Sequence, residues 1–424
     1  MSITLQQCKE LYKETFYIED DTLIDVLVAI ACSAKNMKSD AIWMLIIGPP
    51  SCGKTTYISV LTGIKYAFQI STLTENALLS GMAGNPETEK SLLHKIGEKG
   101  GLILMKDFTT ILTDKEEKKK KILGELREVY EGHLTKATGN GKDAKWGPGA
   151  KVNFVGAVTD AIYMSGGDDA SMGRRMIDYI MPKLSKETRK KMAKKASYNI
   201  NDIGEKRDII TKAFGEFITA KQKEMPLVLP LIPEEIVDEL IDIADFSTIM
   251  RTATKRDFHG NLTFTPEHEV PIRMNNQLLT LAQVMTWLND GVFKQEHKDI
   301  IIKMAFDSIS QQRRIALQVL ARYDKCSTKG IAQVLGYPTT TILTWMEDIN
   351  VIKGCKRSVD GKTDMWELNK DFKVLIQKYD GVPYVGGDLR GTDSEYNDDD
   401  GLEGIDQGTI SEYEKHAQSS FEAF

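Results

Sequence analysis

The sequence predicts an α/β fold built around a parallel β-sheet, and three observations predict it. Between residues 43 and 182, short apolar runs alternate with stretches of helical character, which is the pattern of strands joined by crossover helices. These runs consist mainly of apolar residues, as expected for strands buried on both faces. The first run is followed directly by a glycine-rich turn and another helical stretch. The predicted strands lie at residues 44–47, 67–70, 102–105, 152–158 and 177–181.

A helical segment precedes the predicted sheet. Apolar side chains recur there at helical spacing, and they include Leu5, Cys8, Leu11, Tyr12, Leu23, Val26, Leu27 and Ile30. We therefore assign residues 1–40 to an N-terminal helical segment and residues 41–183 to the α/β core.

The turn after the first strand carries the strongest motif of the chain. Residues 48–55 read Gly-Pro-Pro-Ser-Cys-Gly-Lys-Thr and fit the phosphate-loop pattern GxxxxGK[ST] at every fixed position. Backbone N–H groups of such a loop, with the helix N-terminus behind it, face phosphate oxygens. Lys54 then reaches the β- and γ-phosphates, and the Thr55 hydroxyl ligates Mg²⁺. The predicted cofactors are ATP and Mg²⁺, and the predicted contacts are Gly48, Pro49, Pro50, Ser51, Cys52, Gly53, Lys54, Thr55 and Thr56.

Two further strand ends carry polar side chains that suit nucleotide chemistry. Asp107 follows the run at residues 102–105 and is the candidate second group on Mg²⁺. Thr159 follows the run at residues 152–158, where it can orient the attacking water or only cap the strand. The carboxyl ends of strands line the ligand crevice of open α/β sheets. No glutamate adjoins Asp107, so Glu125 and Glu128, one helix downstream, are candidates for activating water, unless they lie on a solvated helix face.

Two arginines are candidates for stabilising charge on the transferred phosphate. Arg175, with Arg174 as second choice, precedes the last predicted strand. An arginine there can reach the γ-phosphate bound by a neighbouring subunit, although a surface salt bridge is the alternative. Arg273 opens a helix predicted at residues 272–289, where it can contact phosphate in cis.

Helices dominate the region after the core, and the pattern changes again near residue 301. Helices predicted at residues 185–196, 203–224, 233–252 and 272–289 suggest a helical lid over residues 184–300. Farther on, helices are predicted at residues 313–322, 328–335 and 339–350. Strands are then predicted at residues 351–356 and 364–368, on either side of the Asp360-Gly361 turn signal. This order predicts a winged-helix domain at residues 301–380.

Two regions carry residues that suit nucleic acid. The segment 133–151 is rich in glycine and lysine, so Lys142 and Lys145 can contact a phosphate backbone while Trp146 stacks on a base; a mobile surface loop is the alternative. In the predicted winged helix, hydroxyls at a helix start and a basic wing can meet DNA phosphates, although many such domains dock proteins instead. The candidates there are Thr339, Thr340, Lys356 and Arg357.

Charge is distributed unevenly along the chain. The net charge is −6. Residues 388–424 hold eleven acidic and two basic residues, a net charge of −9, which leaves +3 for residues 1–387. Residues 381–424 have few apolar side chains and are predicted to be a disordered acidic tail. Its aromatic end, Phe424, resembles tails of single-strand-binding proteins and suggests docking to a replication protein, with a solubilising role as the alternative.

Composition excludes several classes of protein. No apolar run approaches the ~20 residues of a membrane span, and the first residues lack the features of a signal peptide. The five cysteines form no CxxC pair, which argues against a disulfide framework or a zinc site. We therefore expect a cytoplasmic protein with no membrane partner.

The motifs taken together carry a resemblance to a known family. The phosphate loop, Asp107, Thr159, Arg175 and Arg273 occur in the order of the Walker A, Walker B, sensor 1, arginine-finger and sensor 2 elements of AAA+ ATPases. Several local strings are similar to AAA+-type proteins of phages and mobile elements, namely residues 43–54, 71–74 with 78–81, 106–112, 126–132 and 270–273. A helical lid followed by a winged helix is also similar to MCM-type helicases. The chain departs from the family in two places, because Asp107 has no adjacent glutamate and Arg174 stands where related sequences tend to be acidic.

The resemblance implies an ATP-hydrolysing motor that acts on DNA. It implies a homo-oligomer resembling a hexameric ring, with ATP between subunits, and the role of a replication helicase or translocase of a phage or mobile element. One alternative is a helicase loader or ATP-dependent switch that does not unwind DNA. Another is a DNA-binding transcriptional regulator with a structural ATP site.

Overall fold

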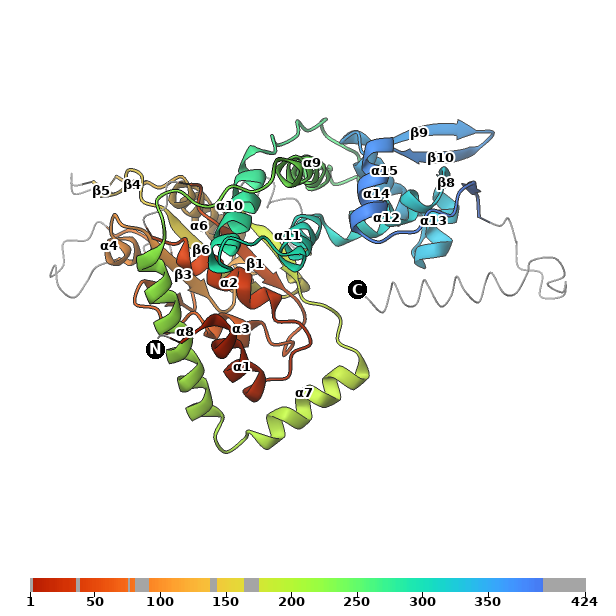
Figure 1. Ribbon diagram of the computed structural model, residues 1–424. Coiled ribbons are helices and arrows are strands. Elements are labelled where there is room, and N and C mark those ends of the chain that lie inside the picture. The colour runs from red at the N-terminus through yellow and green to blue at the C-terminus, as the bar shows by residue number, and fades with distance from the viewer. Residues whose placement is uncertain are drawn as a thin grey trace. The chain divides into compact units, whose positions relative to one another are not determined.

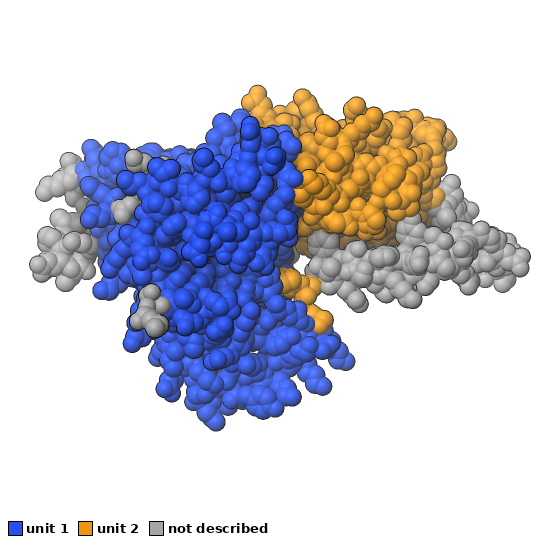
Figure 2. All heavy atoms as spheres, viewed as in Figure 1, with its two compact units in different colours: residues 1–181, 186–245, 270–308 blue, residues 182–185, 246–269, 309–424 orange. Residues whose placement is uncertain are grey.

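The computed structural model describes residues 3–35, 39–74, 77–80, 91–137, 143–163 and 175–391 (Figure 1). The chain divides into two compact units, shown in different colours in Figure 2. Unit 1 comprises residues 1–181, 186–245 and 270–308, and unit 2 comprises residues 182–185, 246–269 and 309–424. Unit 1 thus combines residues that the sequence divides among an N-terminal segment, a core and a lid.

A five-stranded parallel sheet lies at the centre of unit 1, which confirms the predicted α/β class. Its strands, in spatial order, are β2 (Ala67–Ile70), β3 (Gly101–Met105), β6 (Val152–Val158), β1 (Trp43–Ile47) and β7 (Ile177–Ile180). Because all pairs are parallel, the strands share one carboxyl edge, where they end, and one amino edge, where they begin. At the carboxyl edge the end of β1 lies between the ends of β6 and β7.

The core of unit 1 explains why the predicted strands form where they do. Every residue of β1, β3 and β6 is buried, as expected for a sheet covered on both faces. The rings of Trp43 and Phe154 lie 5.3 Å apart, and Phe108 packs edge-on against Phe154. Helix α6 (Glu116–Tyr130) adds its apolar side, including Leu126 and Val129, to the same core.

Helices from distant parts of the chain surround this sheet. Helix α2 packs against α8 and α10, and α1 packs against α8. The buried Asn153 of β6 ties α2 to the sheet, because its amide donates to the Ile30 carbonyl at 2.8 Å. The helices of unit 1 are α1 (Leu5–Thr15), α2 (Thr22–Cys32), α3 (Lys54–Ser59), α4 (Leu92–Ile96), α5 (Thr109–Leu112), α6, the 3₁₀ turn η1 (Asp160–Tyr163), α7 (Lys186–Tyr198), α8 (Ile203–Glu224), α10 (Ile272–Leu288) and α11 (Gln295–Asp307). Helix α9 (Glu234–Met250) continues from unit 1 into unit 2.

The glycine-rich segment before β6 forms a hairpin, as the sequence suggests. Strands β4 (Leu134–Lys136) and β5 (Ala144–Trp146) pair antiparallel. Residues 138–142 between them, which include Lys142, lie outside the described part of the chain.

Unit 2 contains three helices followed by a β-hairpin, in the predicted order. Its elements are α12 (Gln311–Arg322), β8 (Lys325–Ser327), α13 (Thr328–Leu335), α14 (Thr339–Val351), β9 (Cys355–Asp360), β10 (Thr363–Leu368), α15 (Lys370–Tyr379) and β11 (Asp388–Leu389). They include a four-stranded sheet in the order β11-β8-β10-β9. The hairpin turn holds Gly361 at φ +61°, as the Asp360-Gly361 signal predicts.

Two predicted boundaries in this region are wrong. The first hairpin strand was expected at residues 351–356, but α14 runs to Val351 and Lys353 takes φ +61°, so β9 begins only at Cys355. The tail was expected to be disordered from residue 381. Instead β11 pairs with β8, and a Cβ on Gly330 would lie 2.8 Å from Leu389. Residues 392–424 lie outside the described part of the chain.

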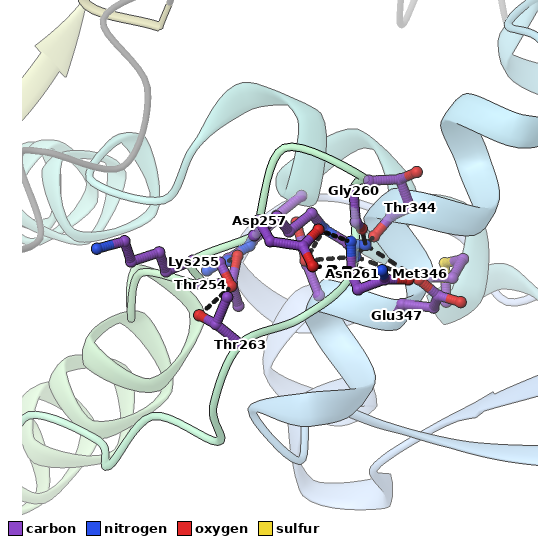
Figure 3. A network of polar contacts seen from close by, with 12 residues as sticks. Thr254, Lys255, Asp257, Gly260, Asn261, Thr263, Thr344, Met346 and Glu347 are labelled. Carbon is purple, nitrogen blue, oxygen red and sulfur yellow. Dashed lines mark hydrogen bonds and ion pairs between the residues drawn. The ribbon is translucent and has the colours of Figure 1, made fainter.

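A loop of unit 2 lies along α14 (Figure 3). In this 255–263 loop, the Asp257 carboxylate accepts from the N–H groups of His259 and Asn261 at 2.9 and 2.8 Å. Arg256 fastens the loop to the helix, since its guanidinium donates to the Asp348 carboxylate at 2.8 Å and to the Thr344 carbonyl at 3.0 Å. The loop therefore covers one side of the C-terminal half of α14.

None of the helices described has the length and the apolar character needed to cross a lipid bilayer.

Candidate nucleotide and nucleic-acid sites

The phosphate loop (residues 48–55) connects β1 to α3 at the carboxyl edge of the sheet. Gly53 has φ +98°, in the left-handed region that glycine adopts readily. Ser51 also has a positive φ, +64°, which is uncommon for a residue with a side chain. Gly48 is needed for a different reason. A Cβ on it would lie 3.0 Å from both the Cys52 Sγ and the Met181 Cβ, so a larger residue would push the loop away from the sheet.

Lys54 is held inside the loop by the loop's own carbonyl groups. Its ammonium donates to the carbonyl oxygens of Gly48 at 2.5 Å and Pro49 at 2.7 Å, and the residue is 8% exposed. An ammonium has three donors and no acceptor, so its natural alternative partners are phosphate oxygens. The geometry thus supplies a cation that can exchange loop carbonyls for phosphate.

Hard oxygen donors suited to Mg²⁺ lie close by along the same edge. Thr55 is exposed in the first turn of α3, followed by the half-buried Thr56, and the exposed Asp107 follows β3. Among the residues described, no group of three His, Cys, Asp or Glu side chains forms a metal cage. Mg²⁺ is commonly bound by one or two protein oxygens together with substrate phosphates, and the Thr55 and Asp107 oxygens fit that mode.

Thr109 joins two of the predicted site residues and was missed by the sequence analysis. Its N–H donates to the Asp107 carboxylate at 3.0 Å. Its hydroxyl accepts from the Thr159 N–H at 3.2 Å and lies 3.4 Å from the Thr159 hydroxyl. The Phe108 N–H also donates to the Ala157 carbonyl at 2.7 Å. The end of β3 is therefore tied to the end of β6, which adjoins β1 and the phosphate loop.

The two glutamates considered for water activation are engaged elsewhere. The Glu125 carboxylate pairs with Lys136 of β4 at 2.7 Å, and the Glu128 carboxylate pairs with His133 at 2.8 Å. Both partners belong to the hairpin segment, so α6 presents these carboxylates to the hairpin. No described contact brings either of them to the phosphate loop.

Arg175 and Arg273 lie together around one aromatic ring. Their guanidinium carbons are 5.6 and 5.8 Å from the centre of the Tyr130 ring. Arg175 also pairs with the Glu131 carboxylate at 2.8 Å. Burial is the main reason that the pKa of Tyr130 is raised, so the ring stays a neutral surface between two cations. Arg174 lies outside the described residues.

This arginine cluster (Arg175, Arg273, Tyr130 and Glu131) lies at the amino edge of the sheet. The Tyr130 ring packs edge-on against Trp43, the first residue of β1, at 5.4 Å. Gln277 of α10 secures the arrangement, because its side chain accepts from the Trp43 N–H and donates to the Tyr130 hydroxyl. The phosphate loop follows the last residue of β1. A five-residue strand is about 13–16 Å long, so the structure does not bring Arg273 to its own phosphate loop.

The prediction that Trp146 stacks on a base does not fit the structure. Trp146 is 5% exposed and belongs to the hydrophobic core of unit 1, with its indole N–H donating to the Gly97 carbonyl at 3.3 Å. Lys145, one residue earlier in β5, is exposed beside Asp143. The alternation of side chains along the strand explains the difference, since neighbours point to opposite faces.

The candidate residues in unit 2 are accessible. Thr339 and Thr340 are exposed at the start of α14, the end that the 255–263 loop leaves uncovered. Lys356 and Arg357 are exposed on β9. Arg357 makes a two-pronged ion pair with Asp364 of β10, at 2.9 and 2.7 Å, so part of its charge is neutralised within the hairpin.

No protein-family model matches this sequence, and no curated protein matches it. Among solved structures, one that is similar comes from Cytophaga hutchinsonii and is provisionally described as an ATPase; it is 13% identical, with a TM-score of 0.43, over 82% of this chain and 94% of that one. A full-length MCM homologue from Methanopyrus kandleri is 11% identical, with a TM-score of 0.42, over 72% of this chain and 59% of that protein. The ORC1 protein of Aeropyrum pernix in complex with DNA is 12% identical, with a TM-score of 0.25, over 86% of this chain and 94% of that one. At these scores the likeness carries no weight in assigning a function, which rests on the residues of the site.

Proposed function

We propose that this chain is an ATPase of the AAA+ type that acts on DNA. One observation carries the proposal. The phosphate loop, Thr159 and Asp107 follow the neighbouring strands β1, β6 and β3, so they share the carboxyl edge of one parallel sheet. Ligands of open α/β sheets bind outside that edge.

Each residue then has a role in phosphate chemistry. Loop N–H groups of residues 51–55 cradle the phosphates, since Pro49 and Pro50 have no N–H to donate. Lys54 leaves its two carbonyl partners to neutralise charge on the phosphates. Bound Mg²⁺ would draw negative charge from the phosphate oxygens, with Thr55 and Asp107 to hold it. The Thr159 hydroxyl orients the attacking water, and Thr109 fixes its position through the contacts at 3.2 and 3.4 Å.

The arginine cluster suggests that the catalytic site is completed by a second copy of the chain. Arg175 and Arg273 lie at the amino edge, away from the phosphate loop of their own chain. We therefore assign both to the nucleotide of a neighbouring subunit in a ring-shaped homo-oligomer. Arg273 accordingly changes from the expected cis role to a trans role. Arg175 would exchange the Glu131 carboxylate for phosphate oxygens when subunits meet.

Unit 2 is assigned to DNA binding as a winged helix. The start of α14 offers Thr339 and Thr340, and the wing offers Lys356 and Arg357. Hydroxyls and cations of this kind position a domain on the phosphate backbone. Lys145, exposed on β5, and Lys142 would add contacts from unit 1. The leading role is a replication helicase or translocase of a phage or mobile element.

The experiment that tests this function measures ATP turnover and strand displacement together. We expect ATP hydrolysis by the full chain to rise when single- or double-stranded DNA is added, and a forked duplex to be separated. No turnover with either DNA would contradict the ATPase assignment and favour a regulator with a structural ATP site.

One observation keeps a second function open, that of a helicase loader or ATP-dependent switch. Asp107 lacks a neighbouring glutamate, and both Glu125 and Glu128 are paired with the hairpin segment. A site without a strong general base hydrolyses ATP slowly, which suits a switch. Slow turnover with no strand displacement at any protein concentration would favour this second function.

The acidic tail is assigned to docking a replication protein through Phe424. The substitution Phe424→Ala leaves all side-chain charges unchanged, so it separates docking from electrostatics. We expect it to abolish co-purification of replication proteins with the full chain. Retention of the same partners would leave the tail, at −9 over residues 388–424, with a solubilising role only.

A further inference from the structure

Helix α7 (yellow-green in Figure 1) is an unusually basic element in an acidic chain. Six of its thirteen residues are Lys or Arg and one is acidic. Figure 1 shows α7 as an outlying helix of unit 1, away from the strands of the sheet. The basic residues are Lys186, Arg189, Lys190, Lys191, Lys194 and Lys195.

Helix α7 is anchored to the rest of unit 1 near its two ends, while most of the residues between them are exposed. Thr188 is its one buried residue, and its hydroxyl donates to the Glu19 carboxylate at 2.7 Å. Just beyond the other end, the buried Asn199 donates to the Thr15 carbonyl at 2.7 Å. Between these anchors the helix has no apolar face that the fold covers, and Tyr198 is 74% exposed. Helices this short are marginal in water on their own, so the anchors hold α7 in place and leave its cations facing solvent.

Within the described part of the chain, carboxylates neutralise little of the positive charge of α7. Lys191 pairs with Glu187 at 2.8 Å. For the other five basic residues of α7, the described part of the chain offers no carboxylate within 4 Å. Lys186, Lys190 and Lys194 follow one another at intervals of four residues, where like charges repel and destabilise a helix. Such an arrangement costs stability unless an external anion compensates it.

Helix α6 is also rich in lysine, but three of its lysines are paired with nearby carboxylates. It contains four consecutive lysines, residues 118–121. Lys119 and Lys120 pair with Glu116 at 2.8 and 3.3 Å, and Lys118 pairs with Asp114. The positive charge of α6 is therefore balanced locally, whereas that of α7 is not.

We propose that α7 is a binding site for the phosphate backbone of a nucleic acid. Lys186, Lys190 and Lys194 form a line of cations about 12 Å long, since four residues of helix rise ~6 Å. A nucleic-acid strand presents its charges at regular short intervals along its axis, which suits such a line. An anionic membrane would also require an apolar face on the helix, which α7 lacks. The proposal rests on the proposed action on DNA, but it places a contact on unit 1, outside both the hairpin and the wing.

The test compares two triple variants of the full chain that remove the same charge. The first is Lys186→Gln, Lys190→Gln and Lys194→Gln in α7. The second is Lys118→Gln, Lys120→Gln and Lys121→Gln in α6, the matched control. Glutamine has nearly the helix propensity of lysine and arginine, so both helices are preserved. The affinity for a fluorescein-labelled oligonucleotide, single- or double-stranded, is measured by anisotropy over a series of salt concentrations.

For the α7 variant we expect a weaker complex with a smaller salt dependence. Loss of three phosphate contacts lowers the slope of log K against log[salt] by about 2–3 and the affinity at ~0.1 M salt by at least ~10-fold. The control should stay within about twofold of wild type, and ATP turnover without DNA and the far-UV circular dichroism should match wild type in both variants.

Three outcomes would overturn the assignment, and they can be told apart. If wild type binds DNA and the α7 variant binds with the same affinity and slope, α7 is not a DNA site, while the proposed function stands. If wild type binds no DNA even at low salt, both proposals fail. If the α7 variant loses binding to phosphatidylserine vesicles but keeps its DNA affinity, the partner is a membrane surface.

Discussion

At the scale of single residues, the ammonium of Lys54 has a choice between two sets of partners. In the structure it is bound by the Gly48 and Pro49 carbonyls, and phosphate would compete with both. We predict that Lys54→Ala and Asp107→Asn each lower ATP turnover by at least ~10²-fold, the scale for removing one charge-stabilising group. Steady-state phosphate release measures this. Two variants with wild-type rates would show that the nucleotide site has been placed wrongly.

Thr109 allows a finer prediction, because its hydroxyl holds Thr159 without belonging to the loop. Thr109→Val keeps the shape of the side chain but leaves the Thr159 N–H without its acceptor, which costs about 1–3 kcal/mol. We expect kcat to fall roughly 10-fold with little change in KM for ATP. Thr109→Ser, which keeps the hydroxyl, is the control and should retain most of the activity. A rise in KM alone would assign Thr109 to nucleotide binding instead.

The residues that sequence patterns identify best are those at strand ends. Lys54, Asp107 and Thr159 could be placed because a short apolar run identifies a strand and parallel strands share an edge. Thr109 could not, because its role depends on the spatial neighbourhood of β3 and β6, whose sequence positions are about fifty residues apart. The error at Trp146 has the same origin. A lone aromatic among glycines and lysines suggests exposure, but the hairpin folds its indole against Gly97.

At the scale of elements, the wing of unit 2 carries a prediction about DNA. Lys356→Glu with Arg357→Glu should weaken binding and flatten its salt dependence, because two cations near the phosphate backbone are reversed. Arg357→Glu also breaks the pair with Asp364, so Lys356→Glu with Lys362→Glu serves as a second variant that leaves this pair intact. Anisotropy titrations measure both. Lys370→Glu with Lys378→Glu makes the same charge change on α15 and is the control.

If the wing variants bind DNA as wild type does, the hairpin docks a protein. Protein docking is a credible alternative for unit 2, because α14 already binds a protein segment, the 255–263 loop, along one side.

Element boundaries show where local patterns are insufficient. All five strands of the large sheet could be predicted, because each is a short apolar run between helical stretches. The start of β9 could not, since Lys353 adopts a left-handed conformation that its sequence does not favour. Strand β11 has only two residues, and it forms because Gly330 leaves room for Leu389. Its formation depends on tertiary contact, so a composition-based boundary at residue 381 missed it.

At the scale of the whole molecule, the arginine cluster predicts that activity requires more than one chain. The Arg175→Ala variant should bind ATP normally, because its own phosphate loop is intact. It should lose turnover, because the nucleotide bound by the neighbouring subunit no longer receives the Arg175 guanidinium. Mixing it with the inactive Lys54→Ala should restore part of the activity, since some interfaces then combine an intact loop with an intact arginine. Turnover is measured across mixing ratios at constant total protein. No recovery at any ratio would assign Arg175 to a structural role beside Glu131.

The separation of the phosphate loop and the arginine cluster onto opposite edges of one sheet has a consequence for how activity depends on assembly. If each complete site combines the phosphate loop of one chain with the arginine cluster of the next, the contact between the two chains is heterologous. An open row of n chains then has n − 1 complete sites. Heterologous contacts either close into rings or continue as filaments. A single chain would then have no complete site, a pair would have one, and only closure would bring the number of sites to the number of chains. Specific activity should therefore increase with protein concentration and level off where the ring closes.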